Sequence, residues 1–582
     1  MKLSPFKGFW VRGQLGVSSI SPLTPALLLA CVVLPLLAAC QAVPDRAYPP
    51  ATESGGDRSP DAIFAEVRPR PQAQDEIVVA FSRGNVQLDF RRSYLASEAQ
   101  IFTAIYEGLF SHHPLTMEPV PAAAQSWVLS EDRRQWTFTI RANARFQNGD
   151  PLRARDFKDS WLSTLEPERN APYSSLFDII EGAQDFRLGR GAIEDVGIFA
   201  PDDRTLIVRL NSPVSFFPSM LCHHSFSPIH PSMIDEQDWS ARWPVSNGPF
   251  YIEEMDSDRI VFARNPYYWD AHQVSMNRIT LKFVDDGVQA SRLWNAGEVQ
   301  WIHGAVCLDT LMDRTNIQVN AMFATHYYFI RSARQPWNDF RLRRALTLVL
   351  PWDEIRGGHI LPATTLIFPI PGYPDVEGLD TVDIAEARRL LAEAGYAGGE
   401  GLPELVIRVP PSREAERVAG LMAEAWLYHL GVQSTIDIVP FEDYLASLHL
   451  DDYDVATITW IGDFADPWTF LKMWNRDSNL NHARHSDDNF EYLVDRSMTE
   501  EGAERWETLA EAEALLLSRG NVLPVSFSIA LNIIDRGEIE GWYPNVLDIH
   551  PFRHLAFRAL RPLPGVVMKP PANAIIRLSN FQ

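Results

Sequence analysis

The chain has 582 residues, which at roughly 150 residues per domain predicts about four domain-sized units and excludes a single small fold. Its formal charge of −23 argues against a nucleic-acid partner, because phosphate binding requires a basic surface. Apolar residues make up 46% of the chain, which is enough to bury substantial cores and argues against global disorder.

The N-terminal segment has the layout of a bacterial secretion signal. Residues 1–22 carry basic side chains and no acidic one, and residues 23–39 follow without a charge. This apolar run is shorter than the about 20 residues that a spanning helix needs. It ends in Leu37-Ala38-Ala39-Cys40, which resembles the lipobox of bacterial lipoproteins, where the cysteine is acylated and becomes the new N-terminus. We therefore predict a lipoprotein signal peptide over residues 1–39 and lipidation at Cys40; the alternative is an ordinary signal with a chance cysteine.

The next segment, residues 40–74, is rich in proline, serine, glycine and charge, which is typical of a flexible stalk. Acyl chains on Cys40 would tether the protein to a membrane surface without spanning it. The longest uncharged run beyond the stalk, residues 211–234, contains four prolines and three histidines and is not expected to span a bilayer. We expect a soluble body in the periplasm or at the cell surface, anchored by lipid.

The first half of the body is predicted to contain short strands, helices and turns. Ile77–Phe81 is an apolar strand, and Ala99–Phe110 has the apolar spacing of a helix that packs by one face. Trp136–Ile140 and Thr205–Leu210 alternate like half-buried strands, and Gln147-Asn148-Gly149-Asp150 is a strong turn signal.

In the second half, predicted helices alternate with predicted strands. Helical patterns cover residues 341–350, 383–394 and 414–430. Apolar strands cover residues 405–409, 432–439 and 454–460. This β-α-β order predicts a parallel sheet flanked by helices, in which ligand sites lie at the carboxyl ends of strands. We therefore expect the functional chemistry in Ile461–Trp468, which follows the last of these strands.

The common enzyme signatures are missing from the sequence: there is no nucleophile elbow, zinc-protease motif, phosphate loop or dinucleotide fingerprint. His482 and His485 are weak metal candidates in a polar stretch, and we expect no metal and no other cofactor. Cys222 and Cys307 either pair or remain buried thiols. The adjacent histidines His223-His224 are expected to diverge in any regular element. A carboxylate pair for glycoside hydrolysis stays open, because its separation is spatial.

Several motifs follow one another in the order typical of one known family. The N-terminal ones are Tyr106–Phe110, Ala124–Trp127 and Ala144–Phe157. The middle ones are Ser246–Phe250, Arg264–Asp270 and Ala296–Val299. The C-terminal ones are Phe340–Leu346, Ala387–Tyr396 and Tyr453–Ala456. With them the chain resembles the extracytoplasmic solute-binding proteins of peptide and nickel ABC importers, the oligopeptide-binding group. Most of these motifs are typical of turns, bends and capped helices, which identify the fold rather than the ligand.

The resemblance implies an α/β fold of the periplasmic-binding-protein type (type II), with two lobes, a hinge and an inserted extra domain. Lobe I is expected from residues 75–96, 211–323 and 538–565. The inserted domain is expected from residues 97–210, and lobe II from residues 324–537. Residues 566–582 are a C-terminal extension to which we assign no function.

The resemblance also implies that the lobes close over an oligopeptide and that an ABC permease in the membrane recognises the closed form. On this interpretation the protein is a monomer and not an enzyme. Asp463 aligns with the aspartate that receives the α-ammonium group of the ligand; the alternative is a solvated loop acid. Trp460 and Phe441 align with aromatic wall positions, with core packing as the alternative.

The peptide backbone is expected to be held by strand-like hydrogen bonds. We expect these from residues 85–89 on one lobe, among them Asn85, Val86 and Gln87, and from residues 458–461 on the other, which end in Ile461.

The chain departs from the family pattern at positions that matter for the ligand. Leu448 and Thr457 stand where enteric members carry arginines for peptide carboxylates, and Ala324 and Ile461 stand where a disulfide would bridge near the hinge. A metal chelate, haem or a glycan therefore remain alternative ligands of the same fold. A secreted hydrolase and a surface adhesin or chaperone-like lipoprotein are the alternatives from other classes.

Overall fold

The computed structural model describes residues 75–82, 86–93, 95–236, 239 and 242–558. The predicted signal peptide, Cys40, the stalk, Asn85 and the extension 566–582 lie outside the described residues. Among the residues that are described, none of the helices combines the length and the hydropathy that a membrane crossing requires.

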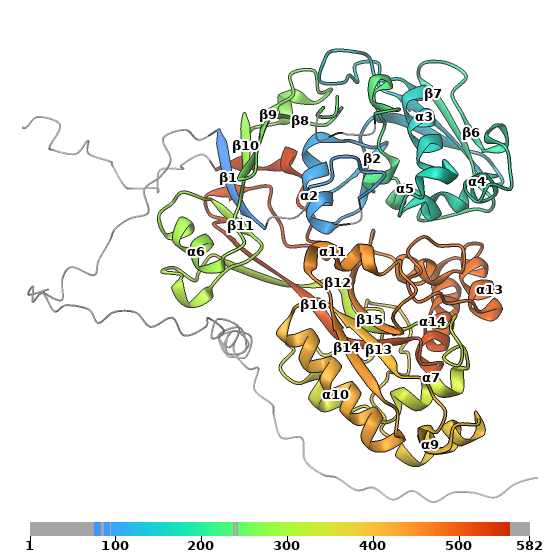
Figure 1. Ribbon diagram of the computed structural model, residues 1–582. Helices are drawn as coiled ribbons and strands as arrows, with labels where there is room; N and C mark the ends of the chain where they lie inside the picture. Colours follow the sequence, from blue (N-terminus) through green and yellow to red (C-terminus); the bar gives the residue numbers. More distant parts are fainter. Residues whose placement is uncertain (1–74, 83–85, 94, 237–238, 240–241, 559–582) are drawn as a thin grey trace, which may run out of the picture. The chain divides into compact units, whose positions relative to one another are not determined.

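A mixed sheet of ten strands organises the fold, in the order β14-β13-β15-β12-β16-β11-β1-β10-β9-β8 (Figure 1). One end consists of β13 (Leu405–Val409), β14 (Ser434–Ile438) and β15 (Val455–Ile461). The other end consists of β1 (Glu76–Phe81), β8 (Phe250–Met255), β9 (Arg259–Arg264), β10 (Arg278–Phe283) and β11 (Trp301–His303). Two long strands, β12 (Ile317–Ile330) and β16 (Val522–Ile534), lie between the two ends.

The parallel pairing predicted from the β-α-β order is confirmed. Strand β13 lies parallel to β14 and to β15. The crossover helix α10 (Arg413–Leu430) packs on β13 and β14, and Gly431 ends it with a positive φ of 71°. Each predicted strand of this half lies within a few residues of its observed bounds. Most of β13 and the first part of β15 are buried, which leaves a strong apolar signal, whereas β14 at the edge of the sheet is only half-buried.

The long strands β12 and β16 connect the two ends of the sheet. Their antiparallel register shifts between Ala321 and Thr325, and in this gap the backbone N–H of Phe323 donates to the carbonyl of Val546 at 2.7 Å. Beyond the shift, β12 pairs with β15 on its other side. The end of β16, residues 532–534, was expected in lobe II but pairs with β11, which was expected in lobe I.

A second, antiparallel sheet lies within the segment predicted as an inserted domain. Its order is β4 (Ala124–Leu129), β5 (Gln135–Ile140), β7 (Thr205–Arg209) and β6 (Ile198–Phe199). Helix α3 (Ala154–Thr164) contacts β6 and β7 and buries Phe157 and Trp161. The predicted strands 136–140 and 205–210 are confirmed here.

Helix α2 (Ala96–Ile105) ends five residues earlier than the predicted end at Phe110. Residues 110–112 instead form β2 (Phe110–His112), which pairs with β3 (Pro119–Pro121). The reason is tertiary. The backbone N–H of Glu107 donates to Asn247 Oδ1 at 3.2 Å, and Asn247 Nδ2 donates to the Glu107 carbonyl at 2.7 Å, so this stretch bonds across the fold rather than along a helix.

Several of the family-like motifs meet at this junction. The buried carboxylate of Glu107 accepts hydrogen bonds from the hydroxyl of Tyr268 and from Nε1 of Trp269. Gly248 fits there only as glycine, because a Cβ atom would lie 2.4 Å from the backbone carbon of Ile105. This set therefore has the structural role that the sequence predicted for most of these motifs.

The remaining elements pack around the two sheets, and their bounds complete the description. The helices are α4 (Ala183–Arg187), α5 (Phe217–Met220), α6 (Gly287–Asn295), α7 (Phe340–Thr347), α8 (Trp352–Arg356), α9 (Ile384–Glu393), α11 (Phe441–Ser447), α12 (Trp468–Leu471), α13 (Asp488–Arg496) and α14 (Gly502–Ser518). A short hairpin pairs β17 (Ile539–Glu540) with β18 (Ala556–Phe557). The predicted N-cap Asp383 accepts a hydrogen bond from the backbone of Glu386 at 2.9 Å.

Candidate functional site

Asp463 lies two residues beyond the end of β15, where the sequence placed the site. Its side chain is buried, with 8% of the residue exposed, so the alternative of a solvated loop acid is wrong. Thr469 fixes it, because the Thr469 hydroxyl donates to Asp463 Oδ2 at 2.6 Å and accepts from the Asp463 backbone N–H at 3.0 Å. The second carboxylate oxygen lies 3.8 Å from Nε2 of His223.

The surroundings of Asp463 are apolar enough to oppose its ionisation. Burial raises the pKa of Asp463 to about 7, although hydrogen bonds from Thr469 and Tyr173 lower it in part. Within the described residues, His223 is the ion-pair candidate of this carboxylate, and burial lowers the pKa of His223 well below its ordinary value. The imidazole is therefore neutral at pH 7, and the carboxylate faces no permanent positive charge there.

His223 and His224 were expected to diverge, but their ring centroids lie 3.9 Å apart. The reason is that His223 has an extended backbone, φ −72° and ψ 140°, and stands just before a short 3-10 helix that begins at His224. The two residues thus belong to no common helix or strand, and the side-chain directions of a regular element do not apply to them. Nδ1 of His223 accepts from the backbone N–H of Ser225 at 3.4 Å, which puts the proton of the neutral ring on Nε2, the atom nearest Asp463.

The two predicted aromatic wall residues have different surroundings. Trp460 is buried, its ring lies 6.4 Å from that of Tyr173, and its indole nitrogen has no hydrogen-bond partner among the described residues. The structure thus brings Trp460, Tyr173 and Asp463 together. Phe441, at the start of α11, is 63% exposed, which excludes core packing for it, and it makes no ring contact with this group in the described structure.

The predicted backbone contacts are in part already occupied. Val86 and Gln87 are half-buried, but the Gln87 N–H donates to Glu98 Oε1 at 2.8 Å, so Gln87 has only its carbonyl to offer an extended ligand. Ile461 pairs with Ala324 across β15 and β12. These are the two positions aligned with the missing disulfide, and their pairing supports that alignment.

Strand β15 has a free edge next to Asp463. It pairs with β12 along its whole length, but β13 pairs with it only at Val455 and Ala456. Residues 458–461 therefore have a strand neighbour on one side only within the described chain. An exposed strand edge is the feature to which an extended peptide adds in β-augmentation.

The two positions that carry arginine in enteric members cannot receive a carboxylate here. Leu448 is fully buried in an apolar cluster. Thr457 is buried as well, and its hydroxyl donates to the carbonyl of Tyr327 at 2.9 Å. A carboxylate group therefore has no charged partner at these two positions.

Phe216, from a segment expected in lobe I, contacts residues that follow Asp463 along the chain. The ring of Phe216 lies 5.7 Å from that of Phe464 and 5.4 Å from that of Trp468, and the guanidinium of Arg505 lies over it at 4.3 Å. Sequence reasoning missed these contacts and the roles of Tyr173, His223 and Thr469. The His223-His224 pair was the only signal it noted.

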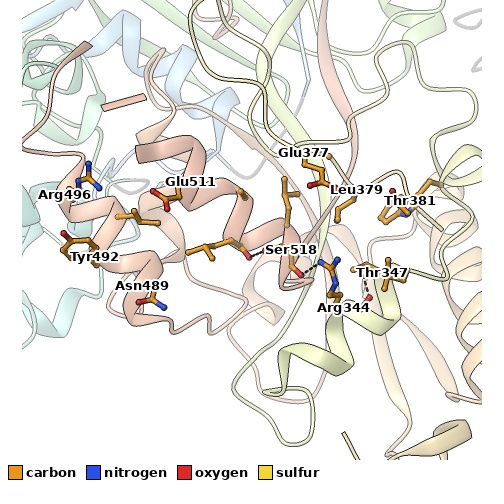
Figure 2. A pocket seen from close by; sticks show the side chains of 17 residues that line it. Arg344, Thr347, Glu377, Leu379, Thr381, Asn489, Tyr492, Arg496, Glu511 and Ser518 are labelled. Carbon is orange, nitrogen blue, oxygen red and sulfur yellow. Dashed lines mark hydrogen bonds between the residues drawn. The ribbon is translucent and has the colours of Figure 1, made fainter. Parts of the chain in front are cut away.

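One cavity lies at the candidate site and a second lies away from it. One of about 60 Å³ lies beside Asp463 and is lined by His112, Cys222, His223, His224 and Arg553, among others; it is too small for a peptide. The other, of about 640 Å³, lies between α7, α8, α13 and α14, where Arg344 donates to the carbonyl of Ser518 at 2.9 Å (Figure 2). The sequence-predicted site residues do not line it.

The weaker sequence candidates do not form a metal site in the described part of the chain. His485 is buried and its Nδ1 lies 3.0 Å from the carbonyl of Trp474, while the ring of His482 packs at 4.9 Å on that of His449. Among the described residues, no three His, Cys, Asp or Glu side chains lie together in an arrangement that could hold a metal ion. Cys222 and Cys307 do not form a disulfide in the described structure.

Comparison with known proteins gives one consistent picture. The family described as bacterial extracellular solute-binding proteins, family 5 (middle), matches residues 118–482. The oligopeptide-binding protein OppA of Bacillus subtilis is 28% identical over 435 residues, which is 70% of this chain and 80% of that protein. The periplasmic oligopeptide-binding protein OppA of Salmonella typhimurium is 28% identical over 505 residues, which is 81% of this chain and 91% of that protein.

Solved structures show the fold. A periplasmic oligopeptide-binding protein of Borrelia burgdorferi superposes with a TM-score of 0.73 at 22% identity, covering 83% of this chain and 100% of that chain. The murein tripeptide binding protein MppA of Escherichia coli gives 0.73 at 24% identity, covering 83% and 98%. The expected α/β fold of the periplasmic-binding-protein type is confirmed.

Proposed function

Because the chain belongs to the bacterial extracellular solute-binding proteins of family 5, we propose that it binds oligopeptides between two lobes and delivers them to an ABC permease. Members of this family are binding proteins and not enzymes, and so is this one. The curated relatives described above are named as oligopeptide-binding proteins, which supports the ligand class.

The observation that carries the proposal is the buried carboxylate of Asp463. A buried carboxylate is costly unless a positive charge and hydrogen bonds compensate it. Hydrogen bonds are present from Thr469, but the neighbouring imidazole of His223 is neutral. The α-ammonium group of a peptide supplies the missing charge, and its N–H groups would bond to Asp463 Oδ1 and Oδ2.

The free edge of β15 supplies the rest of the binding energy. A charge-assisted hydrogen bond contributes about 1.5–3 kcal/mol, whereas a micromolar complex needs about 8.2 kcal/mol in total. Main-chain hydrogen bonds to residues 458–461 and to the carbonyl of Gln87 would provide much of the difference. Side chains of the peptide would add little specificity, since the backbone is common to all sequences.

We propose further that the lobes have the boundaries expected from the sequence, except that residues 532–534 pair with lobe I, and that they hinge where β12 and β16 pass between the two ends of the sheet. The register shift at residues 321–325 supports a hinge there, because it interrupts the ladder of hydrogen bonds. The protein would act as a monomer whose closed form the permease recognises.

We also propose that Cys40 carries the lipid that holds the protein at the membrane. The support is the lipobox-like sequence before it, since the residue lies outside the described structure. The family is extracellular by description, which agrees with export by the predicted signal.

Peptide binding is tested by calorimetric titration of the ligand-stripped protein with a mixture of free-amine tri- to pentapeptides. In parallel, the protein is titrated with a metal chelate, with haem and with an oligosaccharide, which are the alternative ligands of the same fold. Saturable heat with the peptides supports the proposal. Heat with one of the other ligands and none with the peptides would refute the ligand class. Native mass spectrometry of co-purified material gives an independent answer.

A further inference from the structure

A cavity separate from Asp463 lies between two segments that are far apart in the sequence, residues 178–212 and residues 468–498. Its volume is about 280 Å³, near the lower end of the roughly 300–1,000 Å³ that small-molecule sites occupy. Most of its lining side chains are polar, among them Asp178, Gln184, Asn211, Lys472 and Asn475. Of residues 461–468, where the sequence predicted the functional chemistry, only Trp468 lines it, and the proposed peptide path does not use it.

At one wall of this cavity two buried cations lie beside a single buried carboxylate, although the lining as a whole carries more acidic than basic side chains. Arg187 donates to both oxygens of Asp178, at 2.6 and 2.7 Å. The ammonium nitrogen of Lys472 lies 3.6 Å from the same carboxylate. The three residues are only 7–8% exposed. Two buried cations thus share one buried anion, and a buried charge that is not compensated is costly.

Hydrogen-bonding capacity on the same wall is also unused. Within the described residues, the Lys472 ammonium makes the ion pair with Asp178 but donates no hydrogen bond. Trp468 and Asn475, which line the cavity, are more than nine-tenths buried. The indole nitrogen of Trp468 and the amide oxygen of Asn475 have no hydrogen-bond partner in the described structure. Buried polar groups are normally paired, so three such groups at one cavity point to a ligand.

The other charged groups of the lining do not compensate Lys472 fully. Arg476 pairs with Glu491 at 2.8 Å, and Asp477 faces Arg190 at 3.9 Å. Asp495 is influenced by the charge of Lys472, but its side chain is exposed, so water screens it.

We propose that this cavity binds the carboxylate group of a small organic solute, with Lys472 as the group that holds it. Lys472 offers three N–H donors to the carboxylate. Trp468 and Asn475 offer one donor and one acceptor, which suit a hydroxyl group on the same solute. The cavity limits the solute to a few carbon atoms. This site is independent of the proposed peptide site and would bridge the two segments that form it.

The test uses the mature protein without peptide and follows its thermal unfolding with propionate, L-lactate, ethylamine and inorganic phosphate. Propionate and lactate are expected to raise the midpoint in a saturable way, lactate more, and ethylamine is expected to have no effect. Hydrogen exchange with lactate bound should slow in residues 178–188 and 468–476, which locates the site.

Variants of Lys472 sharpen the test. Lys472→Met should weaken lactate binding at least ten-fold, since a charge-assisted contact is lost, whereas Lys472→Arg should retain most of it. Lys282→Met is the matched control, because Lys282 makes a half-exposed ion pair with Glu298 at 3.7 Å, and it should bind lactate like the parent. The proposal is overturned if carboxylates give no shift, if phosphate or ethylamine shifts the midpoint as much as lactate does, or if Lys472→Met binds lactate unchanged.

Discussion

Replacing Asp463 by asparagine removes one charge from the candidate site and little else. The amide oxygen of asparagine can still accept the hydrogen bond that the Thr469 hydroxyl now gives to Asp463 Oδ2 at 2.6 Å, so the local geometry should persist. What is lost is the charge-assisted bond to the peptide ammonium, about 1.5–3 kcal/mol. At about 1.4 kcal/mol per factor of ten, the affinity for free-amine peptides should fall about 10- to 100-fold.

The assay is calorimetric titration at pH 8, where a carboxyl with a pKa of about 7 is mostly ionised. Each protein is titrated with a free-amine tetrapeptide and with its N-acetylated form. The acetylated peptide should bind parent and variant equally weakly, because it brings no charge to residue 463. Asp443→Asn, an exposed aspartate on α11, is the matched control and should bind like the parent. Equal affinity of Asp463→Asn and parent for the free-amine peptide would remove Asp463 from the site.

Three further predictions concern stability and location. Relative to the parent, Asp463→Asn should gain stability in the peptide-free state as pH rises from about 4 to 8. The pKa of Asp463 is about 7 in the folded protein and near 3.9 in the unfolded chain. Ionisation of Asp463 therefore lowers the parent's free energy of unfolding by up to about 4 kcal/mol at pH 8, a cost that is absent below pH 4. Urea unfolding at both pH values checks this, and an equal pH dependence of the two proteins would contradict it. Gly248→Ala should destabilise by about 1–3 kcal/mol in urea, because its Cβ atom would overlap the Ile105 backbone; a loss below about 0.5 kcal/mol would show that the junction is not tightly packed. Cys40→Ser should move the protein from the membrane fraction to the soluble one, and unchanged fractionation would refute lipidation at Cys40.

The sequence predicted those features that depend on local patterns. Between residues 405 and 461, β13 and β15 are largely buried apolar strands and β14 is a half-buried one, and their parallel pairing follows from the alternation of strands and helices. The position of Asp463 after β15 could be predicted for the same reason, together with the motif resemblance.

The features that sequence reasoning missed depend on tertiary contacts. Helix α2 ends at Ile105 because Glu107 bonds to Asn247, which is 140 residues away. Tyr173 and His223 reach Asp463 from distant segments, and only the folded chain shows that the His223 and His224 rings lie 3.9 Å apart. For Phe441 the resemblance gave a position in an aromatic wall but no information on burial, and the side chain is 63% exposed.

The central claim is that a peptide lies as an added strand along the free edge of β15 with its N-terminus at Asp463. A crystal structure of the complex with a free-amine tetrapeptide tests it most directly. The account predicts the α-ammonium nitrogen within hydrogen-bond distance of an Asp463 carboxylate oxygen and peptide backbone hydrogen bonds to residues 458–461. A peptide bound elsewhere, or one whose N-terminus lies away from Asp463 and whose backbone leaves that edge unpaired, would contradict it.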